Sequence, residues 1–439
     1  MRVTPQIIVK SIVNLCVFTT FNVNFFASCE KLFRPDLKHR PVAVLSNNDG
    51  VVVSRSYETK ALGIAMGAPA FKIQDEIKKF QIQTFSSNFN LYLNISNRVM
   101  ALLESFCKDL QIYSVDEAFL EFDNLTEQQA IDLAFKIKNA VLQQVGIHIG
   151  IGIAQTKTLA KLANHFAKQN RSTTHGVFCA LKDPMRQKIL LNNPIGEIWG
   201  IGKALEDKLT QDGFITAFDL SKADEKSIKK AYNINVVKTV KELNNKDCID
   251  NVAQADNQAQ IMWSRSFKDR LYDFEDLLQA VYEYTQESCS KLRAINCWAK
   301  QISVFIRTSY FGEQHKYSNI ATLKLDHPSI DTRVFMSAAK ILLLHIYKSG
   351  YAYNKVGVIL SDFEQERAFQ SDLFVKAPDQ KKLDKDEKLM HTLDKLNKNE
   401  KHTLIIGAQT KIKAKEQECA LKKLSPSYTS AWDELPEVN

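Results

Sequence analysis

Short blocks of hydrophobic and polar residues alternate along the first part of the chain. Residues 41–45 and 50–53 are apolar runs around an Asn-Asn-Asp-Gly stretch, which is typical of two buried strands joined by a tight turn. Residues 95–106 have the periodicity of a helix. Residues 111–122 contain two more apolar runs around an acidic dipeptide, which predicts a strand, a polar turn and another strand. Residues 1–185 are therefore expected to mix helices and strands.

The pattern changes in the middle of the chain. Residues 186–255 have helical character throughout. Residues 260–365 return to mixed character, and there Ile302, Val304 and Ile306 alternate with mostly polar neighbours. That alternation predicts a half-buried strand.

Residues 366–439 form a last region of different composition. Within it, residues 376–402 are crowded with Lys, Asp and Glu and contain few aromatic residues. This composition favours a mobile, solvated tail.

The composition limits the class of protein. The chain of 439 residues has room for about three domains. Its formal net charge of +8 permits a polyanionic partner such as nucleic acid without requiring one. The eight cysteines are scattered and include no Cys-x-x-Cys pair, which argues against a secreted disulfide framework or a zinc ribbon. Reduced thiols in the cytosol are the simplest explanation.

The N-terminus has some features of an export signal. Arg2 and Lys10 precede an apolar stretch, and residues 26–29 resemble a lipoprotein cleavage site. Polar residues interrupt that stretch, however, and no segment approaches the roughly 20 apolar residues of a membrane span. We therefore expect a cytoplasmic protein with no membrane partner, and an exported lipoprotein is the less favoured alternative.

The sharpest local signal is Asp116-Glu117, between two apolar runs. Two adjacent carboxylates fit poorly in a buried core, because an unpaired charge there is unfavourable. An exposed hairpin turn explains them as well as a divalent metal site does. Carboxylate oxygens at a strand end suit Mg²⁺, which proteins often bind with one or two carboxylates plus substrate phosphates.

Two other segments also have both a structural and a functional explanation. Residues 156–168 place an apolar stripe and several lysines on a helix, for which a solvated helix face is the simpler explanation. Gly200 and Gly202 form a Gly-x-Gly at a helix start, which fits a helix-hairpin-helix whose amides hold a DNA phosphate. A lone Gly-x-Gly is a weak signal, and without a preceding strand it disfavours a dinucleotide-binding fold.

Together these motifs resemble those of the Y-family translesion DNA polymerases, and among them the UmuC-like catalytic subunits of bacterial DNA polymerase V. The resemblance runs from about Phe25 to the C-terminus. It is carried by FASCE at 26–30, LSNNDG at 45–50, SVDEAF at 114–119, GIAQTKTLAKLAN at 152–164 and WGIG at 199–202.

The resemblance implies an α+β, multidomain fold shaped like a right hand. Palm and fingers would lie within residues 1–185, and a helical thumb with the helix-hairpin-helix within 186–255. A little-finger DNA-binding domain would occupy residues 260–365. Residues 366–439 would form a flexible tail with a clamp-binding motif.

The implied reaction is DNA-templated addition of dNTPs to a primer 3′ end, in which two Mg²⁺ ions clamp the attacking and leaving oxygens. Asp116 and Glu117 fall on the family's paired catalytic and metal-binding acids. Tyr57, Lys60 and Lys168 fall on positions that hold the incoming triphosphate, where cations offset the charge on the leaving pyrophosphate.

The resemblance also assigns contacts with the sugar, the DNA and other proteins. Phe26 falls on the steric gate, an aromatic ring that excludes a 2′-hydroxyl. The positions implied to meet DNA phosphates are Gly200, Gly202, Ser264, Arg265, Arg307 and Thr308. Gln370, Leu373 and Phe374 resemble the peptide that docks bacterial polymerases onto the sliding clamp, with a chance match as the alternative. A UmuD-type dimer and RecA filaments are the other implied partners.

The chain departs from the family at the end of the first palm strand. The family places an essential aspartate five residues before the gate, where this chain has Phe21, and a one-residue gap would bring Asn22 there. Because that aspartate bridges both metal ions, its loss predicts a fall in rate of about a thousandfold or more. Residues 1–20 match the family poorly, so an altered or mis-assigned start is one explanation.

Two functions therefore stay open. The first is an error-prone translesion DNA polymerase of the DNA-damage (SOS) response, located in the cytoplasm with the nucleoid. The alternative is a catalytically impaired UmuC-like protein that still binds DNA, the clamp and the accessory partners. Phe21 is the residue that distinguishes them.

Overall fold

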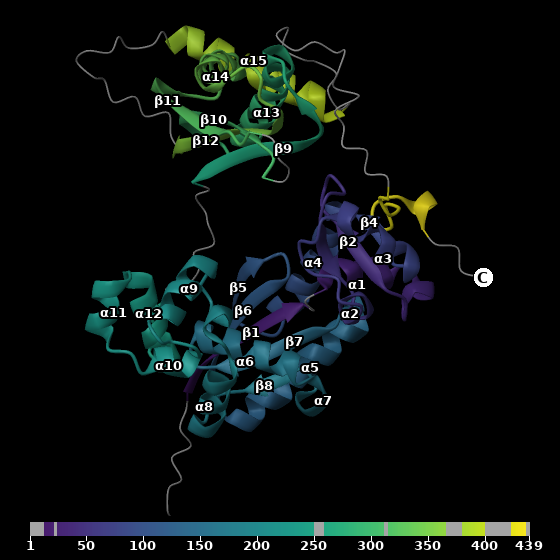
Figure 1. The fold of residues 1–439 in the computed structure, drawn as a ribbon, viewed down its shortest axis with the longest axis vertical. Coiled ribbons are helices and arrows are strands. Elements are labelled where there is room, and N and C mark those ends of the chain that lie inside the picture. Colours follow the sequence, from purple (N-terminus) through teal and green to yellow (C-terminus); the bar gives the residue numbers. More distant parts are fainter. Residues whose placement is uncertain are drawn as a thin grey trace, which may run out of the picture. The chain divides into compact units, whose positions relative to one another are not determined.

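The computed structural model describes residues 13–21 (backbone only), 24–249, 259–310, 315–365, 380–399 and 423–435. The chain divides into two compact units, Met1–Ala255 with Leu421–Asn439 and Asp256–Ala420 (Figure 1). Among the described helices, none has the length and apolar character needed to cross a membrane.

A five-stranded sheet forms the centre of the first unit. Its strands are β1 (Val13–Phe21), β5 (Asp109–Ser114), β6 (Glu117–Leu125), β7 (Ile149–Ala154) and β8 (Val177–Cys179). Their order is β5-β6-β1-β7-β8. β1 lies in the middle and runs antiparallel to both β6 and β7, whereas β8 is parallel to β7. The predicted strand, polar turn and strand over 111–122 are β5 and β6.

Helices cover both faces of this sheet at β7. The isoleucines of β7 point into the core that contains the apolar face of α5 (Glu127–Val145). The glycines of β7 face α6 (Lys157–Gln169) instead, and a Cβ atom on Gly152 would lie 2.1 Å from the carbonyl oxygen of Ala160. Only glycine allows the helix to approach the strand this closely.

A smaller three-stranded sheet in the order β3-β2-β4 has a core of its own. Its strands are β2 (Val42–Leu45), β3 (Val52–Arg55) and β4 (Gln83–Ser86). The first two confirm the predicted strand-turn-strand, whose turn includes Asp49 with a φ of 51°. The helices beside it are α1 (Phe25–Leu32), η1 (Pro35–Leu37), α2 (Tyr57–Ala61), η2 (Ala70–Ile73), α3 (Gln74–Lys79) and α4 (Phe89–Glu104).

Helices follow β8 up to residue 243, in agreement with the predicted helical region. They are α8 (Asp183–Asn192), η3 (Ile195–Glu197), α9 (Lys203–Gln211), α10 (Ala217–Ser221), α11 (Glu225–Ala231) and α12 (Ile234–Leu243), while α7 (Arg171–Thr174) precedes β8. Glu242 of α12 is fully buried and accepts a hydrogen bond from the backbone N–H of Thr158 at 3.0 Å. This contact fixes α12 to the first turn of α6. Figure 1 shows α9–α12 grouped at one side of the unit.

The second unit is a four-stranded antiparallel sheet with helices on one face. Its elements are β9 (Gln260–Leu271), α13 (Phe274–Ala294), β10 (Trp298–Thr308), β11 (Ser318–Ser329), α14 (Thr332–Ile346) and β12 (Tyr353–Glu364). The strand order is β11-β10-β12-β9. Ile302, Val304 and Ile306 of β10 are buried against α13 and α14, which confirms the predicted half-buried strand.

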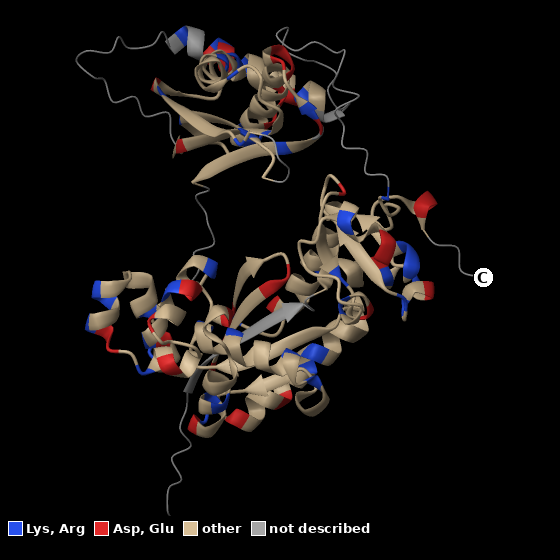
Figure 2. Ribbon diagram, viewed as in Figure 1, with Lys and Arg blue, Asp and Glu red and all other residues tan. Residues whose placement is uncertain are grey.

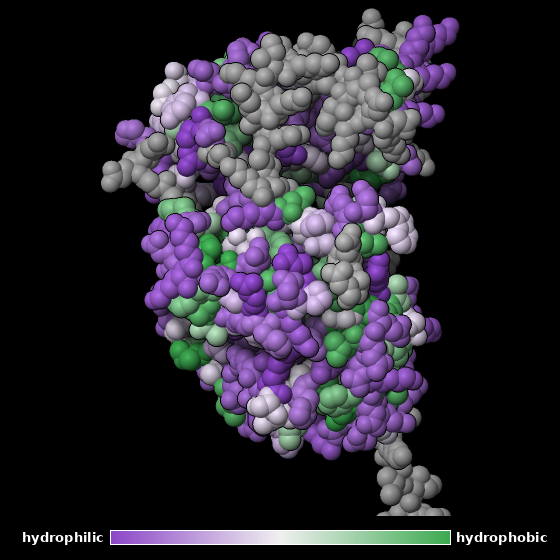
Figure 3. All heavy atoms as spheres, turned by 90° about the vertical axis from the view of Figure 1, so that its right-hand side faces the viewer, coloured by the Kyte–Doolittle hydropathy of each residue, from purple (hydrophilic) through white to green (hydrophobic). Residues whose placement is uncertain are grey.

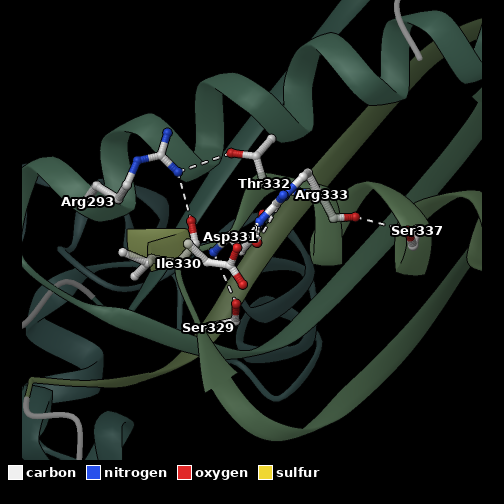
Figure 4. A network of polar contacts seen from close by, with 8 residues as sticks. Arg293, Ser329, Ile330, Asp331, Thr332, Arg333 and Ser337 are labelled. Atoms are coloured by element: carbon white, nitrogen blue, oxygen red, sulfur yellow. Dashed lines mark hydrogen bonds and ion pairs between the residues drawn. The ribbon is translucent and has the colours of Figure 1, made fainter. Parts of the chain in front are cut away.

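A polar network holds the start of α14 against α13 (Figure 4). The guanidinium of Arg293 donates to the carbonyl of Ile330 at 2.8 Å and to the hydroxyl of Thr332 at 3.1 Å. Asp331 caps α14 by accepting from the backbone N–H of Arg333 at 2.8 Å, and its carboxylate also pairs with the Arg333 side chain. The buried Arg293 of α13 therefore bonds to the residue before Asp331 and to the residue after it, where α14 begins.

One described part of the C-terminal region, residues 380–399, differs from the predicted mobile, solvated tail. Residues 380–399 form a helix, α15 (Gln380–Asn399), and Asp394 on it accepts two hydrogen bonds from Arg293 at 2.6 and 2.8 Å. Composition predicted solvation here because it does not reveal that a buried arginine lies opposite one of the acids. Residues 423–435, called the C-terminal segment below, belong to the first unit and include η4 (Trp432–Glu434).

The described surface has mixed charge and polarity. Figure 2 shows basic and acidic residues interspersed on the helices of both units. On the face drawn in Figure 3, hydrophilic residues dominate the described surface and hydrophobic residues occur in small separate areas. Among the described residues of that face, hydrophobic side chains form no broad patch of the kind that marks a large protein interface.

Candidate active site

The acid pair lies at the tip of the β5–β6 hairpin. Asp116 is in the turn, and Glu117 begins β6. In the register of the sheet, Thr20 of β1 lies opposite Glu117 on one side and opposite Gly150 on the other. Phe21, the last residue of β1, therefore lies beside the acidic turn.

Hydrogen bonds within the turn orient the carboxylate of Asp116. The hydroxyl of Ser114 donates to Asp116 Oδ1 at 2.7 Å and accepts from the Asp116 backbone N–H at 3.3 Å. The hydroxyl of Ser96 in α4 donates to the carbonyl of Val115 and so anchors the turn. The turn is half-buried, unlike the exposed hairpin turn that was the structural alternative.

The other carboxylate is paired with a lysine of α6. Lys161 Nζ lies 3.1 Å from Glu117 Oε2. The same ammonium group lies over the rings of Tyr113 at 4.4 Å and Trp199 at 5.1 Å. The interpretation of residues 156–168 as a solvated helix face is therefore wrong at Lys161, and also at the buried Lys157.

Lys168 approaches the acid pair from the C-terminal end of α6. A Cβ atom on Gly150 would lie 3.3 Å from Lys168 Cε, so the lysine stem lies over β7 beside the end of β1. Burial lowers the pKa of Lys168 to about 8. The carboxylates of Glu117 and Asp116 oppose that shift, whereas the nearby cation Arg171 adds to it. These opposing electrostatic effects place Lys168 near both acids.

Arg171 is a candidate residue that the sequence analysis missed. It begins α7, three residues after Lys168, and its guanidinium lies 5.0 Å from the ring centre of Tyr57. Burial raises the pKa of Tyr57, and the charge of Arg171 opposes the rise. The predicted pair Tyr57 and Lys60 lies on α2, where both side chains are exposed. The sequence signal that could have identified Arg171 is its position about one helical turn after the candidate Lys168.

Phe26 lies in an aromatic cluster between α1 and α4. Its ring stacks on Tyr92, with centroids 4.4 Å apart and an interplanar angle of 11°. Phe89 meets Phe26 edge-on at 5.8 Å. The ring of Phe26 is half-buried, so one part of it is held by neighbours and another part is accessible.

The predicted helix-hairpin-helix glycines have open space in front of them. Gly200 has a φ of 87°, which favours glycine, and Gly202 is the N-cap of α9. A Cβ atom at either position would meet nothing within 4 Å. Trp199 next to them donates to the hydroxyl of Tyr113 at 3.0 Å, which connects this loop to the β5–β6 hairpin.

In the second unit, some of the predicted DNA-binding residues share the open face of the sheet. A Cβ atom on Gly357 would touch both Phe305 and Ser264, so these three residues lie on the same face. Arg307 is two residues from Phe305, and Lys355 lies opposite it in the register. Burial and the charge of Arg307 lower the pKa of Lys355, which places two cations together on this face.

Two other predicted DNA-binding residues lie elsewhere. Arg265 is opposite Val356 in the register and lies on the helix-covered side of the sheet, where its side chain is exposed beyond the edge strand. Thr308 is buried, and its hydroxyl accepts from the backbone N–H of Tyr317 at 2.8 Å. Within each of the adjacent pairs Ser264-Arg265 and Arg307-Thr308, the two side chains therefore lie on opposite faces of the sheet.

The remaining predicted positions lie outside the described residues. These are Asn22 and the clamp-binding positions Gln370, Leu373 and Phe374. For Phe21, the register of the backbone is described.

The donor set at the acid pair fits one magnesium ion. Asp116 and Glu117 offer carboxylate oxygens, and Mg²⁺ completes such a set with water and substrate phosphate. In the described part of the chain, no three or more His, Cys, Asp or Glu side chains gather where they could hold a metal ion. The position next to the pair at the end of β1 carries Phe21, which offers no side-chain oxygen. The pair therefore falls short of the donors that two ions require.

Family models match most of the chain. Residues 21–165 match the impB/mucB/samB family, and residues 258–373 match the C-terminal domain of that family. Residues 387–438 match a domain of unknown function (DUF4113).

Curated proteins match the chain over nearly its full length. Protein UmuC of Salmonella typhimurium is 39% identical over 96% of this chain and 100% of its own length. Protein MucB of Escherichia coli is 38% identical over 96% of this chain and 99% of its own length. DNA polymerase IV 2 of Bacillus subtilis is 25% identical over 82% of this chain and 87% of its own length.

Solved structures share the fold. A Y-family DNA polymerase chimera of Dbh and Dpo4 is similar with a TM-score of 0.64 at 22% identity, over 79% of this chain and 98% of the chimera. The likeness supports the right-hand polymerase fold that the motifs implied. Sequence identity, family models and fold agree that the chain belongs to the impB/mucB/samB family, the UmuC-like branch of the Y-family DNA polymerases.

Proposed function

We propose that the chain is the catalytic subunit of an error-prone, DNA-templated translesion DNA polymerase in the DNA-damage (SOS) response. It adds dNTPs to a primer 3′ end. The observation that carries this proposal is the register of the central sheet. That register brings the acid pair, the end of β1 and Lys168 together at one edge.

The residues around the acid pair have different roles in this proposal, according to their charge. Asp116 and Glu117 would hold Mg²⁺, which when bound lowers the pKa of the primer hydroxyl and offsets phosphate charge. Lys168 and Arg171 face a triphosphate with two positive charges and stabilise the pyrophosphate that leaves. Lys161 is held on Glu117 at 3.1 Å and limits the carboxylate's freedom to turn.

Phe26 selects the sugar in this proposal. A flat ring fixed by stacking on Tyr92 leaves room for a 2′-hydrogen and no room for a 2′-hydroxyl. Fixing the ring is essential, because a ring that can turn away yields space for the hydroxyl.

The wider assignment follows the family. Palm and fingers occupy residues 1–185, the thumb 186–255 and the little finger 260–365, with Ser264, Arg307 and Lys355 on the sheet face that meets primer–template DNA. Residues 370–374 dock on the sliding clamp, and a UmuD-type dimer and RecA filaments activate the complex. The protein works in the cytoplasm, at the nucleoid.

A second function is favoured by one observation, the residue at the end of β1. Phe21 stands beside the acid pair where an oxygen ligand would complete a site for two ions. With that ligand absent, the chain would be a catalytically impaired member of the family that binds DNA, the clamp and the accessory proteins.

Primer extension past an abasic site decides between the two functions. The unaltered chain, Phe21→Asp, Asn22→Asp and Asp116→Ala are compared with Mg²⁺ and the activating partners present. Extension by the unaltered chain that Asp116→Ala abolishes supports an active polymerase in which two acids suffice. Extension that appears only in Phe21→Asp or Asn22→Asp supports the impaired protein. Extension that persists undiminished in Asp116→Ala would sink the assignment of the acid pair.

A further inference from the structure

The C-terminal segment contacts the first unit next to the aromatic cluster of Phe26. The backbone N–H of Ser86 in β4 donates to the carbonyl of Lys423 at 2.9 Å, and the Lys423 N–H donates to the Ser86 hydroxyl at 3.1 Å. The ring of Tyr428 stacks on Phe33 with centroids 4.7 Å apart. The segment is therefore seated along the edge of β4 and against the end of α1.

Between these two contacts, Ser425 enters a buried polar cluster. Its hydroxyl donates to Glu30 Oε1 at 3.2 Å. Asn88 Nδ2 donates to the same hydroxyl at 3.0 Å, and the Asn88 carboxamide oxygen caps α4. Ser425 is 4% exposed and Glu30 is fully buried, so solvent cannot replace these bonds.

Glu30 connects this cluster to Phe26. The hydroxyl of Tyr92 donates to Glu30 Oε1 at 2.6 Å, and the ring of Tyr92 stacks on Phe26. Phe26 and Glu30 are four residues apart on α1 and thus lie on the same face of the helix. Tyr92 of α4 contacts both residues, because its ring stacks on Phe26 and its hydroxyl donates to Glu30.

One oxygen atom thus receives hydrogen bonds from two elements far apart in the chain. Tyr92 of α4 and Ser425 of the C-terminal segment both donate to Glu30 Oε1. Among the described residues, the second carboxyl oxygen, Oε2, is buried without a hydrogen-bond partner. Removing the Ser425 hydroxyl leaves Tyr92 as the single donor and frees the carboxyl group to turn, which shifts the Tyr92 ring.

We propose that Ser425 is a positioning residue for Phe26, through which the C-terminal segment sets how strictly the polymerase rejects ribonucleotides. The proposal rests on the proposed function, because it assumes that Phe26 meets the sugar. It also gives a role to part of the stretch 387–438 that matches a domain of unknown function. Ser425 itself touches neither nucleotide nor DNA.

The test uses the full chain with Ser425→Ala and, as a matched control, Ser430→Ala, an exposed serine on the same segment. Affinities for dCTP and CTP are measured opposite a template dG on a chain-terminated primer, so that no turnover is needed. We expect Ser425→Ala to reduce the preference for dCTP by about tenfold, as a small displacement of a positioning contact does. Ser430→Ala should keep the preference of the unaltered chain.

A merely structural role gives a different result. Partial unfolding of Ser425→Ala would weaken dCTP and CTP binding together and leave their ratio unchanged, which would overturn the proposal. Tyr92→Phe, which removes the other donor to Glu30, should reduce the preference too, and the double variant should lose less than the sum of the two effects. Full additivity would contradict a path through Glu30.

Hydrogen–deuterium exchange separates this proposal from the proposed function. Faster exchange in α1 and the first turns of α4 for Ser425→Ala, but not for Ser430→Ala, is expected. Unchanged exchange in both helices would refute the coupling between Ser425 and these helices, whatever the measured nucleotide affinities are. If the unaltered chain binds neither nucleotide while exchange responds as expected, the proposed function fails, and with it the sugar selection, while the coupling itself stands.

Discussion

The carboxyl group of Glu30 is fully buried and shares one oxygen between Tyr92 and Ser425. Burial raises its pKa from an ordinary value of 4.5 to about 7, although the two hydrogen bonds lower it. Burial raises the pKa of Cys29, the neighbouring residue, and that of Tyr428, and the negative charge of Glu30 adds to both shifts. Between pH 4.5 and about 7, the folded protein therefore holds a proton here that the unfolded chain releases.

This raised pKa predicts a pH-dependent stability. The contribution is complete below pH 4.5 and is lost as the pH rises through about 7, because the folded state binds more protons than the unfolded state. We expect this group to reduce the free energy of unfolding by roughly 3 kcal/mol between acid and mildly alkaline pH. Denaturant unfolding at pH 5 and pH 8 measures the change. Glu30→Gln should flatten the slope, and an equally steep slope in that variant would contradict the assignment.

Arg171 leads to a second prediction at this scale. Its guanidinium lies 5.0 Å from the centre of the Tyr57 ring and close to Lys168. Arg171→Ala should raise the KM for dNTPs by roughly tenfold with a smaller change in kcat, since a cation–π contact and a phosphate-facing charge are lost together. Steady-state kinetics check this, with Arg186→Ala on α8 as the control. A fall in kcat at constant KM would mean that Arg171 acts elsewhere.

At the scale of elements, the joint between β7 and α6 places Lys161 and Lys168. Gly152 faces α6 so closely that a Cβ atom would lie 2.1 Å from the Ala160 carbonyl and 2.3 Å from the Asn164 nitrogen. Both obstacles are backbone atoms of α6, so a side chain at this position must push the helix away from the strand. Moving α6 would carry both lysines away from the acid pair.

We therefore expect Gly152→Ala to destabilise the first unit by about 3 kcal/mol, near the upper end of overpacking effects. Gly202→Ala is the matched comparison, because a Cβ atom there meets nothing within 4 Å and the backbone φ is −86°. Thermal unfolding of the two variants checks the difference. Similar unfolding temperatures would show that α6 can shift without loss.

At the scale of the whole molecule, the C-terminal segment packs against α1, which is far from it in sequence. Tyr428 is 7% exposed and packs in the same core cluster as α1, β2 and α4, whereas Trp432 on the same segment is 90% exposed. The two compact units predict separate unfolding transitions. Substitutions of Tyr428 and Trp432 then test which of the two units the C-terminal segment stabilises.

Tyr428→Ala should destabilise the first unit by about 3 kcal/mol, in the range for removing a buried aromatic side chain. The transition of the second unit should stay where it is, and Trp432→Ala should change neither. Differential scanning calorimetry resolves the two transitions. A shift of the second transition alone would contradict this prediction, because it would mean that the segment stabilises the second unit.

Local patterns determined a large part of this fold. The strand-turn-strand at 41–53 and the strands on both sides of Asp116-Glu117 could be predicted, because short apolar runs and the turn residues between them act between neighbours in sequence. The helical region after residue 185 and the buried stripe of β10 follow from the same local rules. Motif resemblance then supplied the family, which the comparisons confirm.

The tertiary structure decided what depends on partners far away in sequence. The ion pair of Lys161 with Glu117 and the hydrogen bond from the Tyr317 N–H to the Thr308 hydroxyl each join residues that no local pattern connects. Glu30 and Ser425 are 395 residues apart, and no periodicity connects them. Hydrophobic spacing records which side of an element is buried, but a hydrogen bond or ion pair depends on which other element is packed against that side.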